Sequence, residues 1–335
     1  MRKFIKYLFL LGIVAFIIAT ALYFLNHKFF MRHNKDTPDS LIIAKNYTIS
    51  NVGRAEELTP PQDRDIDFSY ISLVDETPDF SGLPPGKSSV VKVQDGYKKL
   101  RSQIPIFGEM QERLDPLALV IDSGAFTLES LYAVVNDNSL LRRSGKGIYI
   151  LSVPLVIEVG AILSIQEGDS LLLSAEKGAL ISNFGNLYIN RAIVKGWNVE
   201  QNQPAFYKNP QAFRPYIVSW CGSRSDIVQS EIGYLGYEDS KSYGLTYTSC
   251  ADTLYEEDSP VAVGATGKII NSRIKDLYFG FYSYEAVDIS IVGNQFDKNI
   301  VYGIDPHDRS KNLIIADNKV TGTREKHGII LSRDI

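Results

Sequence analysis

The sequence predicts an all-β protein built as a right-handed parallel β-helix, a solenoid in which every coil adds one rung. Short segments that alternate apolar and polar residues, broken by Gly, Asn and Asp, fill the chain from about Ala118 onward. No amphipathic helix of ordinary length interrupts them, which excludes alternating β/α architectures. Two residue patterns then recur, and their last members are 22–25 residues apart. A β-sandwich also contains short strands, but a fixed period favours the β-helix.

The first thirty residues have the features of a membrane-targeting segment. Arg2, Lys3 and Lys6 precede an uncharged, mostly apolar run, Tyr7–Leu25, that is long enough to cross a bilayer as a helix. Ala19–Ala21 resembles a signal-peptidase site, but the apolar run continues beyond it. We therefore favour a signal anchor over a cleaved signal peptide for residues 1–30, and both predict that the rest of the chain is exported.

Residues 31–117 form a predicted linker and leading segment. This part is rich in Pro, Asp and Ser, which favours irregular, partly extended backbone. Within it, Tyr97–Glu112 carries apolar residues at roughly helical spacing and predicts a short helix that caps the solenoid or packs along it. Residues 118–335 then form the predicted β-helix. Its first strands are Ile148–Ser152, Leu155–Val159, Ala161–Ile165 and Ser170–Ser174.

Two repeated frames give the register of the coils. The first frame reads apolar, polar, polar, any, apolar, and it starts at Ile189, Val228, Ile270, Val292 and Ala316. Its polar positions predict an internal ladder in which Asn294 stacks on Asn318. The second frame centres on a glycine, at Gly244, Gly280, Gly303 and Gly328. The longest interval contains residues 250–259, which we interpret as a loop between rungs.

Stacking the coils by these glycines predicts one polar surface patch. His307 then lies beside Tyr284 and Ser332, because neighbouring strands are only about 4.8 Å apart. By the same register, Asp305 lies beside Tyr282 and Ile330, and Asp308 lies beside Glu285 and Arg333. Alternation along a strand also puts Asp305 and His307 on the same face.

The residue types in this patch suit removal of a proton from a carbon next to a carboxylate. A carboxylate beside an imidazole fixes the ring's tautomer, as a general base requires. The guanidinium of Arg333 neutralises a substrate carboxylate, and the phenols of Tyr282, Tyr284 and Tyr302 line the patch. Blander alternatives remain open. Asp-Pro is a common turn opener, a lone His is often a core residue, the tyrosines can simply pack on the sheet, and Arg333 can pair with Glu285 or Asp308 as surface charge.

Charge and cysteine content narrow the function classes. The formal net charge of -4 gives no nucleic-acid signature. Cys221 and Cys250 fit an exported protein with one disulfide, or else two buried thiols, and their spacing resembles no zinc site. No metal or other cofactor is implied.

The motif Asp305-Pro306-His307-Asp308 resembles that of the exported mannuronan C5-epimerases of alginate-producing bacteria. The resemblance extends from about Ala118 to the end of the chain and includes further segments: Ala179–Ile189, Val194–Asn198, Ser219–Gly222, Leu235–Gly244 and His327–Arg333. This family has a right-handed parallel β-helix fold, and it implies conversion of β-D-mannuronate to α-L-guluronate within polymannuronate.

The resemblance also implies roles for individual residues. His307 would remove the C5 proton, Arg333 would neutralise the C6 carboxylate, and Asp305 and Asp308 would orient them. Water or a tyrosine would return a proton from the opposite face. Tyr282, Tyr284, Tyr302 and His327 are the expected substrate-binding residues. The expected location is the periplasm, anchored in the inner membrane by residues 7–25, with polymannuronate and other proteins of an alginate export complex as partners.

The family pattern further implies several rungs beyond the strand that holds Arg333, whereas this sequence ends at Ile335. We therefore expect weak or no epimerisation by these 335 residues alone, and restored activity when the missing rungs are supplied. Two other function classes remain open: a lyase of uronate polymers, which would leave shorter chains with unsaturated ends, and a non-catalytic polysaccharide-binding or export-scaffold protein.

Overall fold

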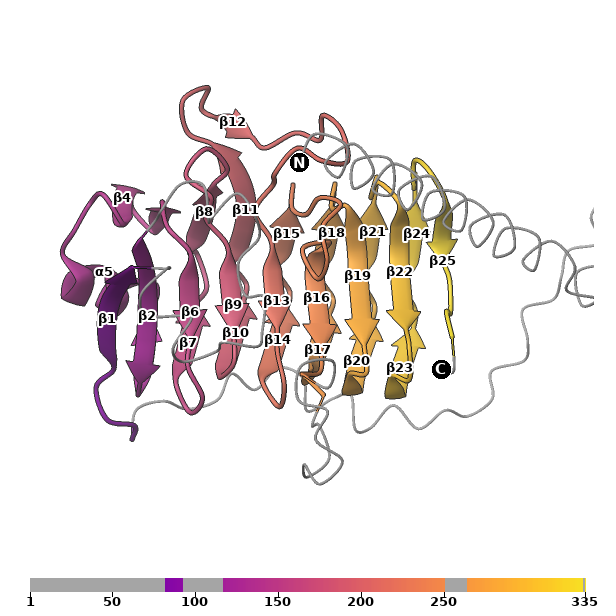
Figure 1. Ribbon diagram of the computed structural model, residues 1–335, viewed down its shortest axis with the longest axis horizontal. Coiled ribbons are helices and arrows are strands. Elements are labelled where there is room, and N and C mark those ends of the chain that lie inside the picture. Colours follow the sequence, from indigo (N-terminus) through magenta and orange to yellow (C-terminus); the bar gives the residue numbers. More distant parts are fainter. Residues whose placement is uncertain (1–81, 93–116, 251–263, 334) are drawn as a thin grey trace, which may run out of the picture. The chain divides into compact units, whose positions relative to one another are not determined.

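Three β-sheets, each made largely of parallel strands, form the part of the chain that the computed structural model describes (Figure 1). The described residues are 82–92, 117–250, 264–333 and 335. The predicted membrane segment Tyr7–Leu25, the helix Tyr97–Glu112 and most of the loop 250–259 lie outside them. Among the described residues, no helix is both long and apolar enough to span a membrane.

Each complete coil gives one strand to each sheet in turn. The first sheet contains, in spatial order, β1 (Lys87–Lys92), β2 (Leu117–Ser123), β6 (Leu155–Ile157), β9 (Ile181–Asn183), β13 (Ile217–Ser219), β16 (Gly244–Thr248), β19 (Phe279–Tyr284), β22 (Tyr302–His307) and β25 (His327–Ile329). The second contains β3 (Ala125–Thr127), β7 (Ile162–Ile165), β10 (Asn186–Asn190), β14 (Arg224–Val228), β17 (Thr266–Ile270), β20 (Val287–Val292) and β23 (Lys311–Ala316).

The third sheet closes each coil. It contains β4 (Leu141–Gly145), β5 (Ile148–Leu151), β8 (Ser170–Ser174), β11 (Ile193–Asn198), β15 (Glu231–Gly233), β18 (Arg273–Lys275), β21 (Gln295–Asp297) and β24 (Lys319–Thr321), and the short β12 (Gln203–Pro204) pairs with β11. The pairing between successive coils is parallel throughout: Ile291, for example, lies beside Ile269 and Ile315. The predicted all-β parallel β-helix is thereby confirmed for the described residues.

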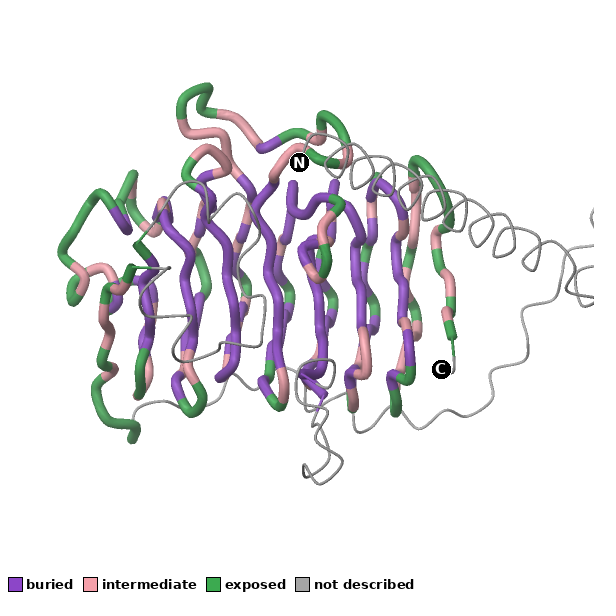
Figure 2. Tube along the Cα trace, in the orientation of Figure 1, coloured by how far each residue is buried: buried purple, intermediate pink, exposed green. Residues whose placement is uncertain are grey.

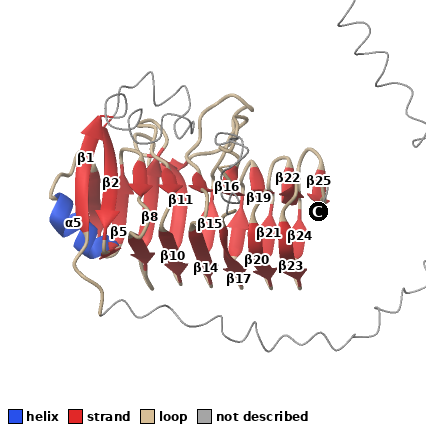
Figure 3. Cartoon of the chain, turned by 60° about the horizontal axis from the view of Figure 1, so that its bottom comes forward, coloured by secondary structure: helices blue, strands red, loops and turns tan. Residues whose placement is uncertain are grey.

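Apart from β12, which pairs antiparallel with β11, the exceptions to parallel pairing among the described strands lie at the first coil. β1 pairs antiparallel with β2, and β4 pairs antiparallel with β5. Between β3 and β4 lies a helix that the sequence did not predict, α5 (Leu128–Val135), at the same end as β1 (Figure 3). Thr127 and Ser130 cap it reciprocally, and Leu128 and Leu131 are fully buried. The helix thus adds apolar side chains to the core of the first coil.

The core runs through the coils as columns of aliphatic side chains. One column consists of Ile165, Ile189, Ile227, Ile269 and Ile291, all fully buried. Burying each such side chain stabilises the fold by about 1.5–3 kcal/mol. Figure 2 shows the buried backbone following the strands, with most of the exposed residues in the turns and insertions. The side chains that point outward from the sheets are therefore the ones available for function.

A ladder of polar side chains stabilises the turn between the second and third sheets. Asn294 Nδ2 donates to Asn318 Oδ1 at 3.0 Å, which confirms the predicted stack. Asn294 Oδ1 accepts from the backbone N–H of Ser272 at 2.8 Å, and Ser272 Oγ accepts from the N–H of Ser230 at 3.1 Å. The frame that starts at Ile189 was placed one residue out of register, because Ile189 pairs with Ile227 and not with Val228.

The glycine frame is correct for three of its four members. Gly280, Gly303 and Gly328 align because Phe279 pairs with Tyr302, and Tyr302 pairs with His327. A Cβ at Gly303 would lie 2.4 Å from the carbonyl oxygen of Gly328, so the close approach requires glycine. Gly244 instead lies opposite Phe279, because the register shifts between Gly244 and Thr246.

Two long-range links tie coils together outside the sheets. Cys221 and Cys250 form a disulfide with a Cα–Cα distance of 5.1 Å, so the first of the two alternatives left open by the sequence, a disulfide rather than two buried thiols, is correct.

Residues 199–216, here called the β12 insertion, contribute the buried Arg214. Its Nη2 lies 3.0 Å from Asp276 Oδ1, and Arg324 binds the other oxygen of the same carboxylate. Asp276 follows β18 and Arg324 follows β24, so this ion cluster spans two coil intervals.

Candidate active site

The candidate site lies on the outer face of the first sheet, where β19, β22 and the chain after β25 run side by side. Tyr282 pairs with Asp305, Tyr284 pairs with His307, and His307 forms an isolated parallel bridge with Ser332. These are the neighbours that the glycine register predicted, because the misplaced Gly244 lies outside this stretch. Ile304 is in the core while His307 is partly exposed, so the strand presents its polar residues outward.

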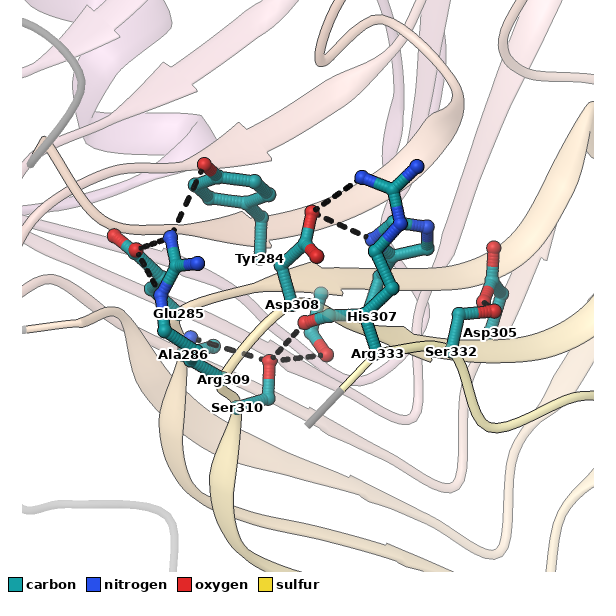
Figure 4. Close-up of polar contacts among 11 residues, drawn as sticks. Tyr284, Glu285, Ala286, Asp305, His307, Asp308, Arg309, Ser310, Ser332 and Arg333 are labelled. Atoms are coloured by element: carbon teal, nitrogen blue, oxygen red, sulfur yellow. Dashed lines mark hydrogen bonds and ion pairs between the residues drawn. The ribbon is translucent and has the colours of Figure 1, made fainter. Parts of the chain in front are cut away.

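His307, Asp308 and Arg333 form the centre of the site (Figure 4). His307 Nδ1 lies 2.9 Å from Asp308 Oδ2, but the angles of this contact are not those of a hydrogen bond. Arg333 Nη1 approaches the same oxygen at 3.8 Å. Asp308 and Arg333 both have positive φ, at 32° and 57°, so the chain bends there and turns both side chains toward the imidazole. Arg333 stays 75% exposed and is open to a ligand.

Asp305 lies on the other side of His307 and is almost completely buried, with 2% of its surface exposed. Ser332 Oγ donates to Asp305 Oδ1 at 3.3 Å. Burial raises the pKa of Asp305 to about 6, and the neighbouring His307 opposes this shift. The carboxyl group therefore titrates just below neutral pH.

The two tyrosines of β19 complete the wall beside the imidazole. The Tyr282 ring centroid lies 5.6 Å from that of His307. Burial raises the pKa of Tyr282 above its usual range, and the nearby Tyr243 and Asp305 add to the shift. Tyr282 thus remains a neutral phenol and a potential proton donor at physiological pH.

The sequence left two carboxylates open as partners of Arg333, Glu285 and Asp308, and the contacts of Glu285 decide between them. Arg309 binds Glu285 through its Nε at 2.8 Å, and its Nη2 lies 3.5 Å from the Tyr284 hydroxyl. Glu285 therefore has its own guanidinium, and Arg333 faces Asp308. This leaves Arg333, rather than Arg309, as the cation next to the imidazole.

Tyr302 and His327 form a separate group at the start of their strands. Their rings stack with centroids 6.1 Å apart, and Lys326 Nζ lies 5.4 Å from the Tyr302 ring centroid. Tyr302 also meets Phe279 edge-on at 4.8 Å. The expected substrate-binding residues therefore form two groups. Tyr282 and Tyr284 lie beside His307, and Tyr302 and His327, here called the aromatic shelf, lie at the start of β22 and β25.

Lys241 is the main site residue that the sequence reasoning missed. It lies in the loop between β15 and β16, and its Nζ is 3.3 Å from the Tyr284 ring centroid. The loop falls outside the repeated frames, so no periodic signal placed it near the site. The only sequence indication was its position inside the Leu235–Gly244 segment of the family resemblance.

Comparison with known proteins adds relatives that share this fold. Residues 225–334 match the model of the family described as periplasmic copper-binding protein (NosD). Among the described residues, no group of three or more His, Cys, Asp or Glu side chains is placed to hold a metal ion. The chain also aligns with a crystal structure of the periplasmic alginate epimerase AlgG at 32% identity and a TM-score of 0.71, covering 84% of this chain and 66% of that one.

Curated relatives are named as mannuronan C5-epimerases. The mannuronan C5-epimerase of Pseudomonas aeruginosa is 36% identical over 299 residues, which cover 87% of this chain and 54% of that protein. The mannuronan C5-epimerase AlgG of Azotobacter vinelandii is 34% identical over 302 residues, covering 87% and 56%. The chain spans about half the length of the curated relatives it matches. These similarities confirm the family resemblance: the chain is a homologue of the mannuronan C5-epimerases.

Proposed function

We propose that this protein is a mannuronan C5-epimerase, which converts β-D-mannuronate to α-L-guluronate within polymannuronate. The observation that carries the proposal is the convergence of His307, Asp308 and Arg333, from two neighbouring coils, on one outward-facing patch. The relatives that bear this name share the fold and about a third of the sequence. Both lines of evidence lead to the same chemistry.

In the proposed reaction, His307 is the base. Asp308 attracts a proton on Nδ1, which leaves the Nε2 lone pair to accept the C5 proton. The electron pair of the broken C–H bond is delocalised into the C6 carboxylate, and Arg333 neutralises the charge that develops there. Because Arg333 is exposed and only 3.8 Å from Asp308, it can exchange that contact for the substrate carboxylate.

Reprotonation from the opposite face inverts C5 and completes the reaction without loss of atoms. The donor is water or a tyrosine, and the candidate phenol is Tyr282, whose ring lies beside the imidazole of His307 and which burial keeps protonated. Asp305 and Asp308 hold the imidazole and guanidinium in place. Tyr284, Tyr302 and His327 bind neighbouring sugar rings along the sheet, where aromatic faces suit the apolar faces of sugars.

We further propose that the protein acts in the periplasm, anchored in the inner membrane by residues 7–25, beside other proteins of an alginate export complex. The related crystal structure is that of a periplasmic alginate epimerase, which supports the compartment. The anchor rests on the apolar run in the sequence.

The decisive experiment is exchange of the C5 hydrogen. In deuterated water, polymannuronate treated with the wild-type protein should gain deuterium at C5, and His307→Ala should abolish the gain while polymer binding survives. His327→Ala is the matched control, because it also removes a histidine but only from the aromatic shelf. It should weaken binding and leave exchange at saturation largely intact.

Each other outcome contradicts the proposal in a distinct way. Near-normal exchange in His307→Ala would remove His307 from the base role. Shorter chains with unsaturated ends would identify a lyase. Polymer binding without any exchange by the wild-type chain, also when the chain is extended to the length of its relatives, would identify a non-catalytic binding protein.

A further inference from the structure

The turn that follows the proposed base is one residue longer than the turn on which it stacks. Tyr284 pairs with His307, and Val287 pairs with Lys311. Two residues separate the first members of these pairs along the chain, and three residues separate the second members. The extra residue lies in the segment 308–310, here called the base turn, which carries the carboxylate next to the imidazole.

The backbone of the base turn is unfavourable by itself. Two successive residues, Asp308 and Arg309, have left-handed backbone, with φ of 32° and 53°. The shorter turn contains one such residue, Glu285, with φ of 51°. Residues with side chains adopt this conformation at a cost, and they keep it only where their surroundings impose it. The base turn therefore depends on contacts that hold it.

Ser310 holds the base turn from inside the coil (Figure 4). Its side chain is buried, and its Oγ donates to the carbonyl oxygen of His307 at 2.8 Å. The same Oγ accepts from the backbone N–H of Ala286, in the coil before, at 3.4 Å. The first contact joins the two ends of the base turn, and the second ties it to the neighbouring coil.

Ser283 on β19 fixes the direction of this hydroxyl group. Its Oγ lies 2.9 Å from that of Ser310, and it is fully buried. A hydroxyl has one proton to donate, and Ser310 uses its proton on the carbonyl of His307. Ser283 is therefore the donor between the two serines. Because it lies between Tyr282 and Tyr284 in β19, the serine pair ties the strand of the two tyrosines to the base turn.

A second buried serine pair shows the same contact away from the site. Ser219 at the end of β13 and Ser225 on β14 have their Oγ atoms 2.6 Å apart, and both are fully buried. They lie at the same corner of the solenoid, between the first and second sheets. The further partner of Ser225 Oγ is a side chain, because Asn183 Nδ2 donates to it at 3.0 Å. This pair thus supplies a comparison in which stability alone is at stake.

We propose that Ser310 is a positioning residue for the epimerisation. Its hydroxyl, held by Ser283, keeps the base turn in the shape that places Asp308 against the imidazole. Without it the two ends of the turn lose their contact, and the carboxylate no longer directs the proton to Nδ1 of His307. This inference rests on the proposed function, because it assigns a buried hydroxyl that never touches the substrate a part in that reaction.

Ser310→Ala tests the proposal against the matched control Ser225→Ala. Each variant removes one buried hydroxyl of a serine pair, so the two melting temperatures should fall by similar amounts. In deuterated water, Ser310→Ala should lower kcat for exchange at C5 of polymannuronate about tenfold and leave KM unchanged, because the base is misaligned while the binding groups stay in place. Ser225→Ala should keep the wild-type kcat.

Ser283→Ala extends the comparison, because it leaves Ser310 in place but removes its donor. It should lower kcat less than Ser310→Ala does. The double variant should be no slower than Ser310→Ala, because the two serines act through one contact. Ser283→Ala also supplies the comparison with Ser225→Ala if Ser310→Ala does not fold.

A second measurement does not require turnover. In protein labelled with ¹⁵N at its four histidines, the imidazole ¹⁵N shifts show which ring nitrogen carries the proton, and His307→Ala identifies the signals of His307. At about pH 8, where an ordinary imidazole is neutral, this proton should lie mainly on Nδ1, because Asp308 Oδ2 is 2.9 Å away. Ser310→Ala should move part of it to Nε2, and Ser225→Ala should not.

The outcomes that overturn the inference are distinguishable from failure of the proposed function. If the wild-type chain exchanges C5 hydrogen and Ser310→Ala keeps its kcat or its tautomer, the hydroxyl has no positioning role while the proposed function stands. Equal losses of kcat in Ser310→Ala and Ser225→Ala would reduce the effect to general stability and also overturn the role. If the wild-type chain catalyses no exchange, the proposed function fails and the positioning role fails with it.

Discussion

A single carboxylate oxygen, Oδ2 of Asp308, faces both the imidazole of His307 and the guanidinium of Arg333. The two cationic or potentially cationic groups therefore compete for it until a ligand arrives. A substrate carboxylate on Arg333 would release Asp308 to align with Nδ1 of His307. At the scale of the residue, this shared oxygen links substrate binding to orientation of the base.

The planar fork of Arg333 should matter as well as its charge. Arg333→Ala should lower kcat/KM about a hundredfold, equivalent to about 3 kcal/mol, because a charge-assisted contact that strengthens in the transition state is lost. Arg333→Lys keeps the charge but loses the bidentate geometry, so it should retain part of the activity. Arg309→Ala is the control, and it should stay within a few-fold of wild type. Equal effects of Arg333→Ala and Arg309→Ala would contradict the assignment.

The buried carboxyl of Asp305 should make stability depend on pH. Its folded-state pKa of about 6 lies above the usual 3.8, so between these values the folded protein binds more protons than the unfolded chain. Stability relative to Asp305→Asn should therefore fall as pH rises through this window. Thermal melts of both proteins across the window measure the difference. The control is Asp317→Asn, which changes an exposed carboxylate, and its stability should depend on pH in the same way as that of the wild type. If the stability of Asp305→Asn also follows the wild-type pH dependence, the raised pKa of Asp305 is disproved.

At the scale of the element, the polar ladder holds the turns of successive coils together. Asn294 uses its amide oxygen for the N–H of Ser272 and its amide nitrogen for Ile269 O and Asn318 Oδ1. One side chain thus satisfies groups on both adjacent coils and links three coils in all. Parallel strands alone would leave these turn groups without partners inside the coil.

Asn294→Ala should destabilise the fold by about 2 kcal/mol, because it leaves buried backbone groups of neighbouring coils unsatisfied. Asn312→Gly is the control on β23, because it removes one exposed hydrogen bond to Asp288 and suits the left-handed backbone of this residue, whose φ is 55°. It should change stability by less than about 0.5 kcal/mol. Chemical denaturation of the two variants and wild type measures both values. A loss at Asn294 no larger than that at Asn312 would show that the ladder contributes little.

The repeated elements could be predicted from the sequence because each coil meets the same physical requirement. Asn294 over Asn318, and Gly303 between Gly280 and Gly328, recur at one period since each must fill the same place in the stack. The neighbours of His307 followed from that period. Ile189 was misplaced by one residue because its true partner Ile227 and the adjacent Val228 are both apolar, and the pattern alone does not choose between adjacent positions.

Features that occur once could not be predicted in this way. α5 interrupts a single coil, and the loop with Lys241 follows no period, so neither leaves a repeating signal. The partners of Arg214 lie 62 residues away in the sequence and depend on the path of the β12 insertion. Chemistry contributed by insertions is therefore visible only once the coils are placed in space.

At the scale of the whole molecule, Asp276 is the point where distant parts of the solenoid meet. Arg214 is 2% exposed, and burial lowers its pKa only to about 10, so it stays charged at neutral pH. Its guanidinium depends on the carboxylate of Asp276 for compensation. Arg324 shares the same carboxylate but is itself 40% exposed.

Asp276→Ala should therefore cost about 3 kcal/mol of unfolding free energy, because a buried guanidinium loses its counter-charge. Arg214→Met removes that charge and fills a similar volume, so it should cost far less, about 1 kcal/mol or below. The double variant should resemble Arg214→Met. Denaturant titrations of the three proteins test the order, and an Asp276→Ala variant as stable as Arg214→Met would refute the coupling.

The same ion cluster has a consequence for how the chain folds. A solenoid in which each coil touches only its neighbours can fray from an end, one coil at a time. Here the carboxylate of Asp276 binds Arg324 two coils farther on and Arg214 of an insertion that precedes it. Release of the coil that carries Arg324 would weaken the docking of the β12 insertion, and through Pro215 the turn that holds Lys241. The coil that carries Arg324 and the turn that holds Lys241 are thereby made into one cooperative unit, which should open together in hydrogen exchange.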